Sequence, residues 1–243
     1  RTPSLCLRDS DFRWHLSEFM HSYVFFRDLV TSGQVAMVAV SHSCYRNALP
    51  ARIALRCGIP SFVVTADTCN RLTADRQFTS LEALDFPREF RKLPEQQQVE
   101  GRSLARKTLE DRLKGLSLHG IDYVKAGPFA ETIPTRLIRE SSNFKVLIAP
   151  HNFDDSPHGM GLHAFPDVLR WLEFLGRISS ELDYDWYLKT HNDLLPRSRK
   201  TVEAIVSKYP RIKLLPLEAS HRQIIDEGID AALTIYGTIG VEY

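Results

Sequence analysis

The feature that most constrains the fold is a regular alternation of short apolar runs and amphipathic segments after residue 144. Apolar runs of strand length occupy residues 145–149, 185–189, 212–215 and 231–235. Helical apolar patterns lie between them at 165–182, at 198–209 and from a capping box at Ser220 to Gly228. Strands that are apolar on both faces, joined through helices by short connections, predict a doubly wound parallel sheet.

A shorter alternation precedes this region. A helical stripe covers residues 11–30, and apolar strands at 35–40 and 59–66 flank a helix at 47–57. This order predicts another parallel sheet covered by helices. A stretch of mixed charge at 70–118 indicates an exposed helical insertion, with a helix at 98–116. Chain-breaking Gly-Pro and Ile-Pro pairs follow, and we therefore predict domains at 1–143 and 144–243.

Composition limits the class of protein. The chain has 243 residues, of which 43% are hydrophobic and 25% charged, with a net charge of +1. This balance is typical of a globular protein and favours no nucleic acid partner. No apolar run reaches the roughly 20 residues of a membrane span, and no signal peptide is visible. We expect a cytoplasmic protein with four reduced cysteines. Because Arg1 replaces an initiator Met and the second sheet is unfinished at Tyr243, we expect both termini to be missing.

Polar clusters follow four of the predicted strands. They are Ser41-His42-Ser43 with Tyr45, the loop from His151 to His158, Lys189-Thr-His191, and Gly237 to Glu242. The carboxyl edge of an open parallel sheet is where ligands bind, so four clusters at such edges predict a ligand site.

The chemistry of these clusters favours an anionic, nucleotide-like ligand. Lys189 offers a charge for a phosphate, and His191 can donate a hydrogen bond to a phosphate oxygen or contact a ribose. The turn at Gly237-Thr238 offers backbone N–H groups, and Glu242 can accept from ribose hydroxyls. The alternative is that the glycines only permit close packing.

Other site types are less well supported. The chain lacks both GxGxxG after a strand and GxxxxGK[ST], which disfavours NAD enzymes and ATPases. A metal site would draw on His151, Asp154, Asp155, His158 and His163, but their spacing is irregular. We therefore expect no metal and no other cofactor.

Several segments resemble a known family. They are 145–149 with His151, Asp155-Ser-Pro-His-Gly159, Phe165-Pro-Asp167, Trp186 to His191, Ser220-His221, and Thr234 to Glu242. Together they resemble the C-terminal domain of bacterial surface- and capsule-polysaccharide biosynthesis proteins, which are similar to GT-B glycosyltransferases. The resemblance covers 145–243, is looser over 35–66 and is weak between 70 and 140. It departs from the family at Asn192, where a proline is expected.

The resemblance implies two Rossmann-like domains facing a cleft, the second truncated, that transfer a sugar from a nucleotide-sugar to a surface or capsular polysaccharide. The acceptor would be a glycan or a lipid-linked glycan, and the protein would work at the inner face of the membrane as a peripheral partner. The residues that would bind the nucleotide-sugar donor are Lys189, His191, Ser220, His221, Gly237, Thr238 and Glu242. The residues that would bind the rest of the substrate are Tyr45, His151, Asp155, Ser156 and His158.

His42 is the candidate catalytic base of the first domain, since histidine changes protonation near neutral pH. It could instead only hydrogen-bond to substrate or backbone. Two other functions stay open. One is a sugar-nucleotide epimerase of the same architecture, in which Asp154 or Asp155 would shuttle protons. The other is a non-catalytic protein that binds a nucleotide or glycan.

Overall fold

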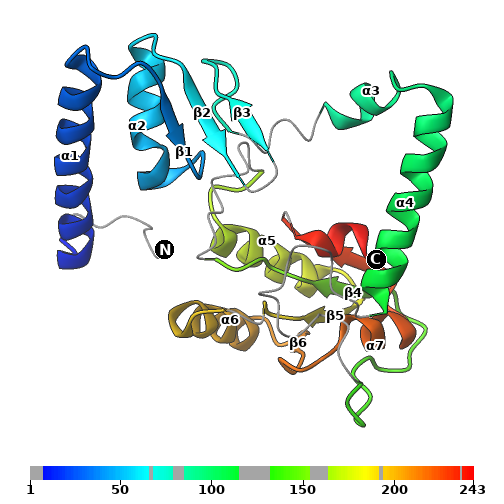
Figure 1. Ribbon diagram of the computed structural model, residues 1–243. Coiled ribbons are helices and arrows are strands. Elements are labelled where there is room, and N and C mark those ends of the chain that lie inside the picture. The colour runs from blue at the N-terminus through cyan, green and yellow to red at the C-terminus, as the bar shows by residue number, and fades with distance from the viewer. Residues whose placement is uncertain are drawn as a thin grey trace. The chain divides into compact units, whose positions relative to one another are not determined.

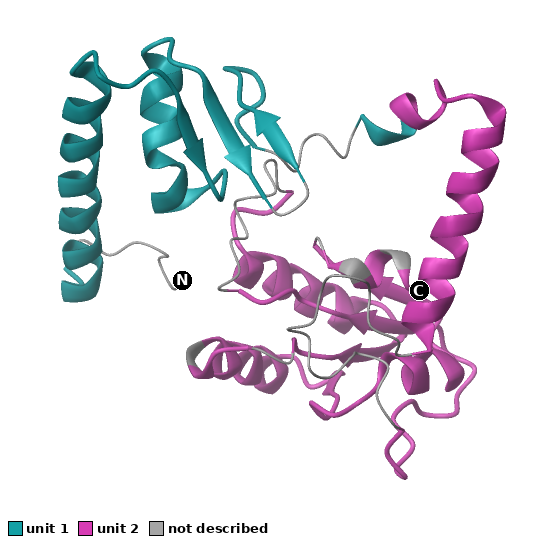
Figure 2. Cartoon of the chain, in the orientation of Figure 1, with its two compact units in different colours: residues 1–87, 158–162 teal, residues 88–157, 163–243 magenta. Residues whose placement is uncertain are grey.

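The computed structural model describes residues 8–65, 68–78, 85–114, 132–153, 164–191, 194–235 and 237–243. These residues form two compact units, one up to Pro87 and the other from Arg88 onward (Figure 2). Each unit contains helices and a sheet with parallel strands (Figure 1). The predicted α/β class is therefore confirmed for the described residues.

The first unit is built around a small sheet. Its elements are α1 (Ser10–Thr31), β1 (Val38–Val40), α2 (Tyr45–Arg56), β2 (Ser61–Val64) and β3 (Cys69–Arg71). Strands β1 and β2 are parallel, and α2 connects them. Strand β3 pairs with the other edge of β2 in the antiparallel direction.

The antiparallel strand β3 departs from the predicted parallel sheet. A parallel partner needs a crossover of about a dozen residues, usually a helix. Only residues 65–68 separate β2 from β3, and the N–H of Thr65 donates to the carbonyl of Thr68 at 2.9 Å. The described part of the first unit therefore holds one parallel βαβ unit with an antiparallel edge strand, and a doubly wound sheet is not confirmed there.

Helix α1 contributes little to the core of this unit. Val30 is its only buried residue, and with Phe26 it packs against Leu49 and Ile53 of α2. Half of the apolar stripe that predicted the helix is exposed. Leu16 and Phe19 are each 42% exposed, and Tyr23 is 38% exposed. The apolar stripe therefore predicted the helix correctly, but it did not predict how little of the helix is buried in this unit.

The second unit contains a four-stranded parallel sheet. Helix α3 (Phe86–Phe90) spans the boundary between the units. The later elements are α4 (Glu95–Leu113), β4 (Lys145–Ile148), α5 (Val168–Glu181), β5 (Asp185–Leu188), α6 (Pro196–Lys208), β6 (Ile212–Leu214), α7 (His221–Asp226), β7 (Ala231–Leu233) and the 3-10 helix η3 (Thr238–Val241). The strand order is β6-β5-β4-β7, with every neighbouring pair parallel.

Alternate residues of these strands supply two apolar cores. Val146 and Ile148 of β4 face α5 and α6, where they pack with Leu172 and Val202. On the opposite face Leu147 packs with residues that include Leu137, Ile138, Ile224 of α7 and Ile239 of η3. A sheet covered on both faces explains the continuous apolar runs in the sequence. The second unit is compatible with the predicted Rossmann-like fold.

Contacts divide the chain at a different place from the predicted domain boundary between residues 143 and 144. Leu137 and Ile138 are buried in the second unit, and both of their N–H groups donate to Oε2 of Glu227 at 2.7 Å. Helix α4, predicted within an insertion of the first domain, is also grouped with the second unit. Its Arg112 forms an ion pair with Glu242.

Close packing of α5 against the segment after α6 gives a stability prediction. A Cβ atom on Gly176 would lie 2.2 Å from Cδ2 of Tyr209, whose ring fills the space beside the helix. Gly176→Ala should therefore lower the free energy of unfolding by about 1–3 kcal/mol, as overpacked cores do. Denaturant titration measures the change.

Gly101→Ala is the matched control, because it also places alanine in a helix. There the added Cβ would meet only the ring edge of Phe90 at 3.0 Å, a half-buried side chain at the end of α3 that needs to shift by a few tenths of an ångström. Alanine is favoured over glycine in helices by about 1 kcal/mol, so this variant should be neutral or more stable. Equal stability of Gly176→Ala and the wild type would contradict the packing argument.

Candidate functional site

The strand order places a topological switch point between β4 and β7. From β4 the chain proceeds to β5 and β6 on one side, and then returns to β7 on the other side of β4. In open α/β sheets, ligands bind outside the carboxyl ends of the strands at such a reversal. Residues 149–151 follow β4, residues 189–191 follow β5 and residues 234–237 follow β7. Three of the four predicted polar clusters thus belong to this one edge.

Two predicted site histidines come together here. The rings of His151 and His191 have centroids 5.6 Å apart, because each residue follows one of two adjacent parallel strands. His151 is half-buried, and its Nδ1 lies 3.3 Å from the carbonyl oxygen of Asn152. His191 is exposed. Asp155, Ser156 and His158 were predicted to join them and lie outside the described residues.

Lys189, the first residue after β5, is a buried cation. Only 5% of the residue is exposed, and its Nζ donates to the carbonyl of Leu217 at 3.2 Å. Burial lowers the pKa of the Lys189 ammonium group, and the nearby carboxylate of Glu218 partly offsets that effect by raising it. A buried ammonium group is favoured by an anion that replaces its lost hydration. The position therefore suits a phosphate.

The turn after β7 is accounted for by packing. The N–H of Gly237 donates to the hydroxyl of Thr234 at 3.2 Å, and the N–H of Gly240 donates to the carbonyl of Gly237 at 3.1 Å. A Cβ on Gly237 would lie 3.0 Å from Oγ1 of Thr234. The expected helix is the 3-10 helix η3 over four residues, Thr238–Val241. Anion binding at Gly237 and Thr238 stays a prediction, with packing now a sufficient reason for the glycines.

Glu242 is a buried carboxylate held by two basic side chains. Arg112 of α4 donates to its Oε1, and Nδ1 of His221 lies 3.6 Å from its Oε2. Burial raises the pKa of Glu242, but His221 and Arg112 outweigh it, so that the pKa lies below its usual value. Arg112 precedes Glu242 by 130 residues in the sequence, and no local pattern could reveal this pairing.

Ser220 and His221 have structural contacts of their own. The hydroxyl of Ser220 accepts from the N–H of Gln223 at 3.1 Å, which confirms the predicted cap of α7. The Gln223 side chain does not complete the capping box, because its Oε1 accepts from the N–H of Ile133 at 3.0 Å while its Nε2 donates to the carbonyls of Ile133 and Thr135. His221 is half-buried, and its ring centroid lies 5.8 Å from that of Tyr243.

The predicted residues of the first unit lie at the carboxyl end of β1. His42 is exposed, and its Nδ1 lies 3.0 Å from the hydroxyl oxygen of Ser41. Tyr45 opens α2 with a φ of 53°, a conformation that residues other than glycine rarely adopt. Strained backbone of this kind clusters at binding sites and switches, so Tyr45 stays a candidate.

The described part of the chain shows neither a metal-binding cluster nor a membrane-spanning helix. No group of three or more His, Cys, Asp or Glu residues suited to a metal is found there. Within those same ranges, no helix is both long and apolar enough to span a bilayer. Of the residues considered for a metal site, Asp154, Asp155, His158 and His163 lie outside the described residues.

Comparison with protein-family models and with curated proteins finds no match for the chain.

Proposed function

We propose that the chain is a glycosyltransferase that uses a nucleotide-sugar donor, and that the second unit binds the donor. The observation that carries the proposal is the switch point between β4 and β7, with Lys189, His151 and His191 at the same sheet edge. Sheets of this topology bind nucleotides at such a point. A buried lysine and two imidazoles that follow neighbouring strands at one sheet edge suit a diphosphate.

Each side chain has a role in this proposal. Lys189 neutralises the diphosphate and stabilises it as the leaving group, which is the electrostatic contribution that usually dominates catalysis. His191 and His151 donate hydrogen bonds to phosphate or sugar oxygens. Glu242 orients the turn after β7 through its pair with Arg112. A direct contact between Glu242 and a ribose hydroxyl would have to compete with that pair.

The first unit would supply the acceptor side of a GT-B-like enzyme. His42 is the proposed base that removes the proton of the attacking acceptor hydroxyl, since it is exposed at the carboxyl end of β1. The acceptor is a glycan or lipid-linked glycan of surface polysaccharide synthesis, reached at the inner face of a membrane. No metal is required when Lys189 compensates the phosphate charge.

A panel of CMP, CDP, UDP and GDP tests donor binding by thermal unfolding. A ligand at 100 times its Kd stabilises the folded state by about 2.7 kcal/mol, so one nucleotide should raise the Tm by several degrees. Inorganic diphosphate at equal concentration is the control for charge alone. If every nucleotide left the Tm unchanged, the proposal would fail. Conversion of the matching nucleotide-sugar without any acceptor would instead identify an epimerase.

A further inference from the structure

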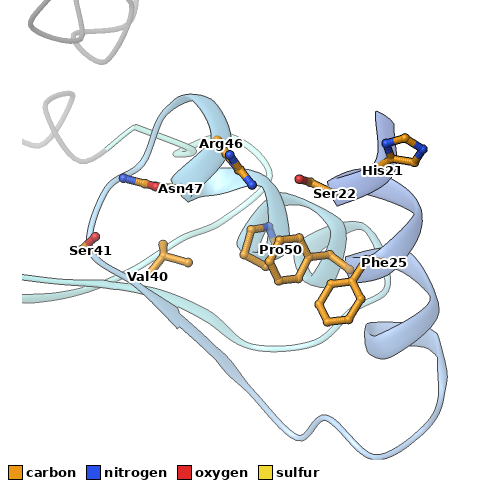
Figure 3. A pocket seen from close by; sticks show the side chains of 9 residues that line it. His21, Ser22, Phe25, Val40, Ser41, Arg46, Asn47 and Pro50 are labelled. Carbon is orange, nitrogen blue, oxygen red and sulfur yellow. The ribbon is translucent and has the colours of Figure 1, made fainter. Parts of the chain in front are cut away.

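A surface hollow of about 630 Å³ lies in the first unit between α1 and α2 (Figure 3). Residues of three elements line it: from α1 His21, Ser22, Phe25 and Phe26, from the end of β1 Val40 and Ser41, and from α2 Arg46, Asn47 and Pro50. Its volume falls in the range of about 300–1,000 Å³ that is typical of small-molecule sites. His42 and Tyr45, the candidates of this unit predicted from sequence, are not among the lining residues.

The polar part of the hollow has a positive centre. Arg46 is its permanent cation, and no lining residue is acidic. Asp28, an acidic residue of the same α1, is engaged by Arg27 at 2.8 Å. Among the described residues Arg46 forms no ion pair. Figure 3 shows the side chains of Arg46 and Ser22 extending toward one another from α2 and α1. Arginine with neighbouring hydroxyl and amide groups binds oxyanions.

The rest of the hollow is apolar. Phe25 is 62% exposed, and it lies beside Phe26 and Pro50. Figure 3 shows Phe25 and Pro50 below the polar groups in that view. Exposed aromatic surface next to a cation favours a ligand with an apolar or ring-shaped body next to an anionic group.

We propose that this hollow binds a small organic anion, whose oxyanion lies at Arg46 and whose apolar or ring-shaped body lies against Phe25. Ser22 donates a further hydrogen bond to the oxyanion. The oxyanion is a phosphate or a carboxylate, since Arg46 can hold either one through paired N–H groups. This inference goes beyond the proposed function, because it uses no residue of the second unit.

The test is calorimetric titration of the full chain with phenyl phosphate, phenylacetate, inorganic phosphate and benzyl alcohol. At least one of the aromatic anions should bind at least about 10-fold more tightly than either inorganic phosphate or benzyl alcohol, since a hydrogen bond to a charged group contributes about 1.5–3 kcal/mol. The tighter of the two aromatic anions identifies the oxyanion. Equal affinity for inorganic phosphate and the aromatic anions would overturn the proposal.

Variants locate the binding. Arg46→Gln should weaken binding of the preferred aromatic anion by at least about 10-fold, by the same charged hydrogen bond. Arg56→Gln, an exposed arginine at the other end of α2, should bind as the wild type does. Phe25→Ala should weaken binding of the aromatic anion but not of inorganic phosphate.

A further variant separates this site from the donor site. Lys189→Met should leave the binding of the aromatic anion unchanged. If Lys189→Met abolished that binding while Arg46→Gln did not, the anion would occupy the second unit and the inference would be wrong. Nucleotide binding by Arg46→Gln is expected to match the wild type, so failure of one proposal leaves the other intact.

Discussion

His42→Ala should reduce sugar transfer by about 10²–10⁴-fold, the usual contribution of a general base. The imidazole is exposed at the end of β1, and Ser41 is its hydrogen-bonding neighbour at 3.0 Å. Nucleotide affinity should stay unchanged, because the proposed donor residues belong to the second unit. Single-turnover transfer and calorimetric nucleotide titration measure the two quantities separately.

His15→Ala is the matched control for this variant. His15 is an exposed histidine of α1 whose ring contacts Trp14, and it belongs to neither proposed site. Its replacement should leave transfer at the wild-type rate. If His42→Ala lost nucleotide affinity and transfer in equal measure, His42 would be a binding residue and not the base.

Lys189→Met is expected to weaken nucleotide binding by about 10–100-fold, as loss of a hydrogen bond to a charged phosphate does. The same substitution should preserve or increase stability, because it removes a charge that is costly to bury. Replacing a binding residue lowers affinity without lowering stability, whereas replacing a structural residue lowers both. A variant that lost stability and affinity together would indicate that Lys189 only supports the fold.

The pH dependence of stability gives an independent check on Lys189. Its pKa is lowered in the folded state by burial, from an ordinary value of 10.5. A group whose pKa is lower in the folded state than in the unfolded state contributes its full stability above the unfolded-state pKa. This stability is lost as the pH falls through the folded-state pKa. Wild-type stability should therefore rise, relative to Lys189→Met, as pH increases from the lowered pKa toward 10.5. Lys145→Met, at the amino end of β4, is the control for the nucleotide titration of Lys189→Met and should bind nucleotide as the wild type does.

Much of the second unit could be predicted from the sequence because its signals are local. The strands predicted at 145–149, 185–189, 212–215 and 231–235 each match an observed strand to within two residues. Their apolar runs are long enough to indicate burial on both faces, and Ser220 and Gly228 give definite limits to α7. Apolar periodicity and capping are properties of neighbouring residues, and sequence patterns report these well.

Other features depend on contacts that no local pattern reports. Strand β3 is the polar tripeptide Cys69-Asn-Arg71, which has no apolar alternation and is formed by pairing with β2. The Glu242 carboxylate was predicted to meet a ribose, but Arg112 is its neighbour through the tertiary fold. The hollow beside Arg46 also escaped prediction. Its residues come from separate elements, and each is an ordinary residue on its own helix or strand.

The strand order has a consequence for how the chain is synthesised. Strand β4 is the first of its sheet to leave the ribosome, and β7, its neighbour on one side, is the last. Until β7 emerges, one edge of the apolar β4 has no partner, and unpaired strand edges of this kind promote aggregation. We therefore expect the nascent sheet to be most prone to aggregation while the chain between Val146 and Ala231 is being synthesised.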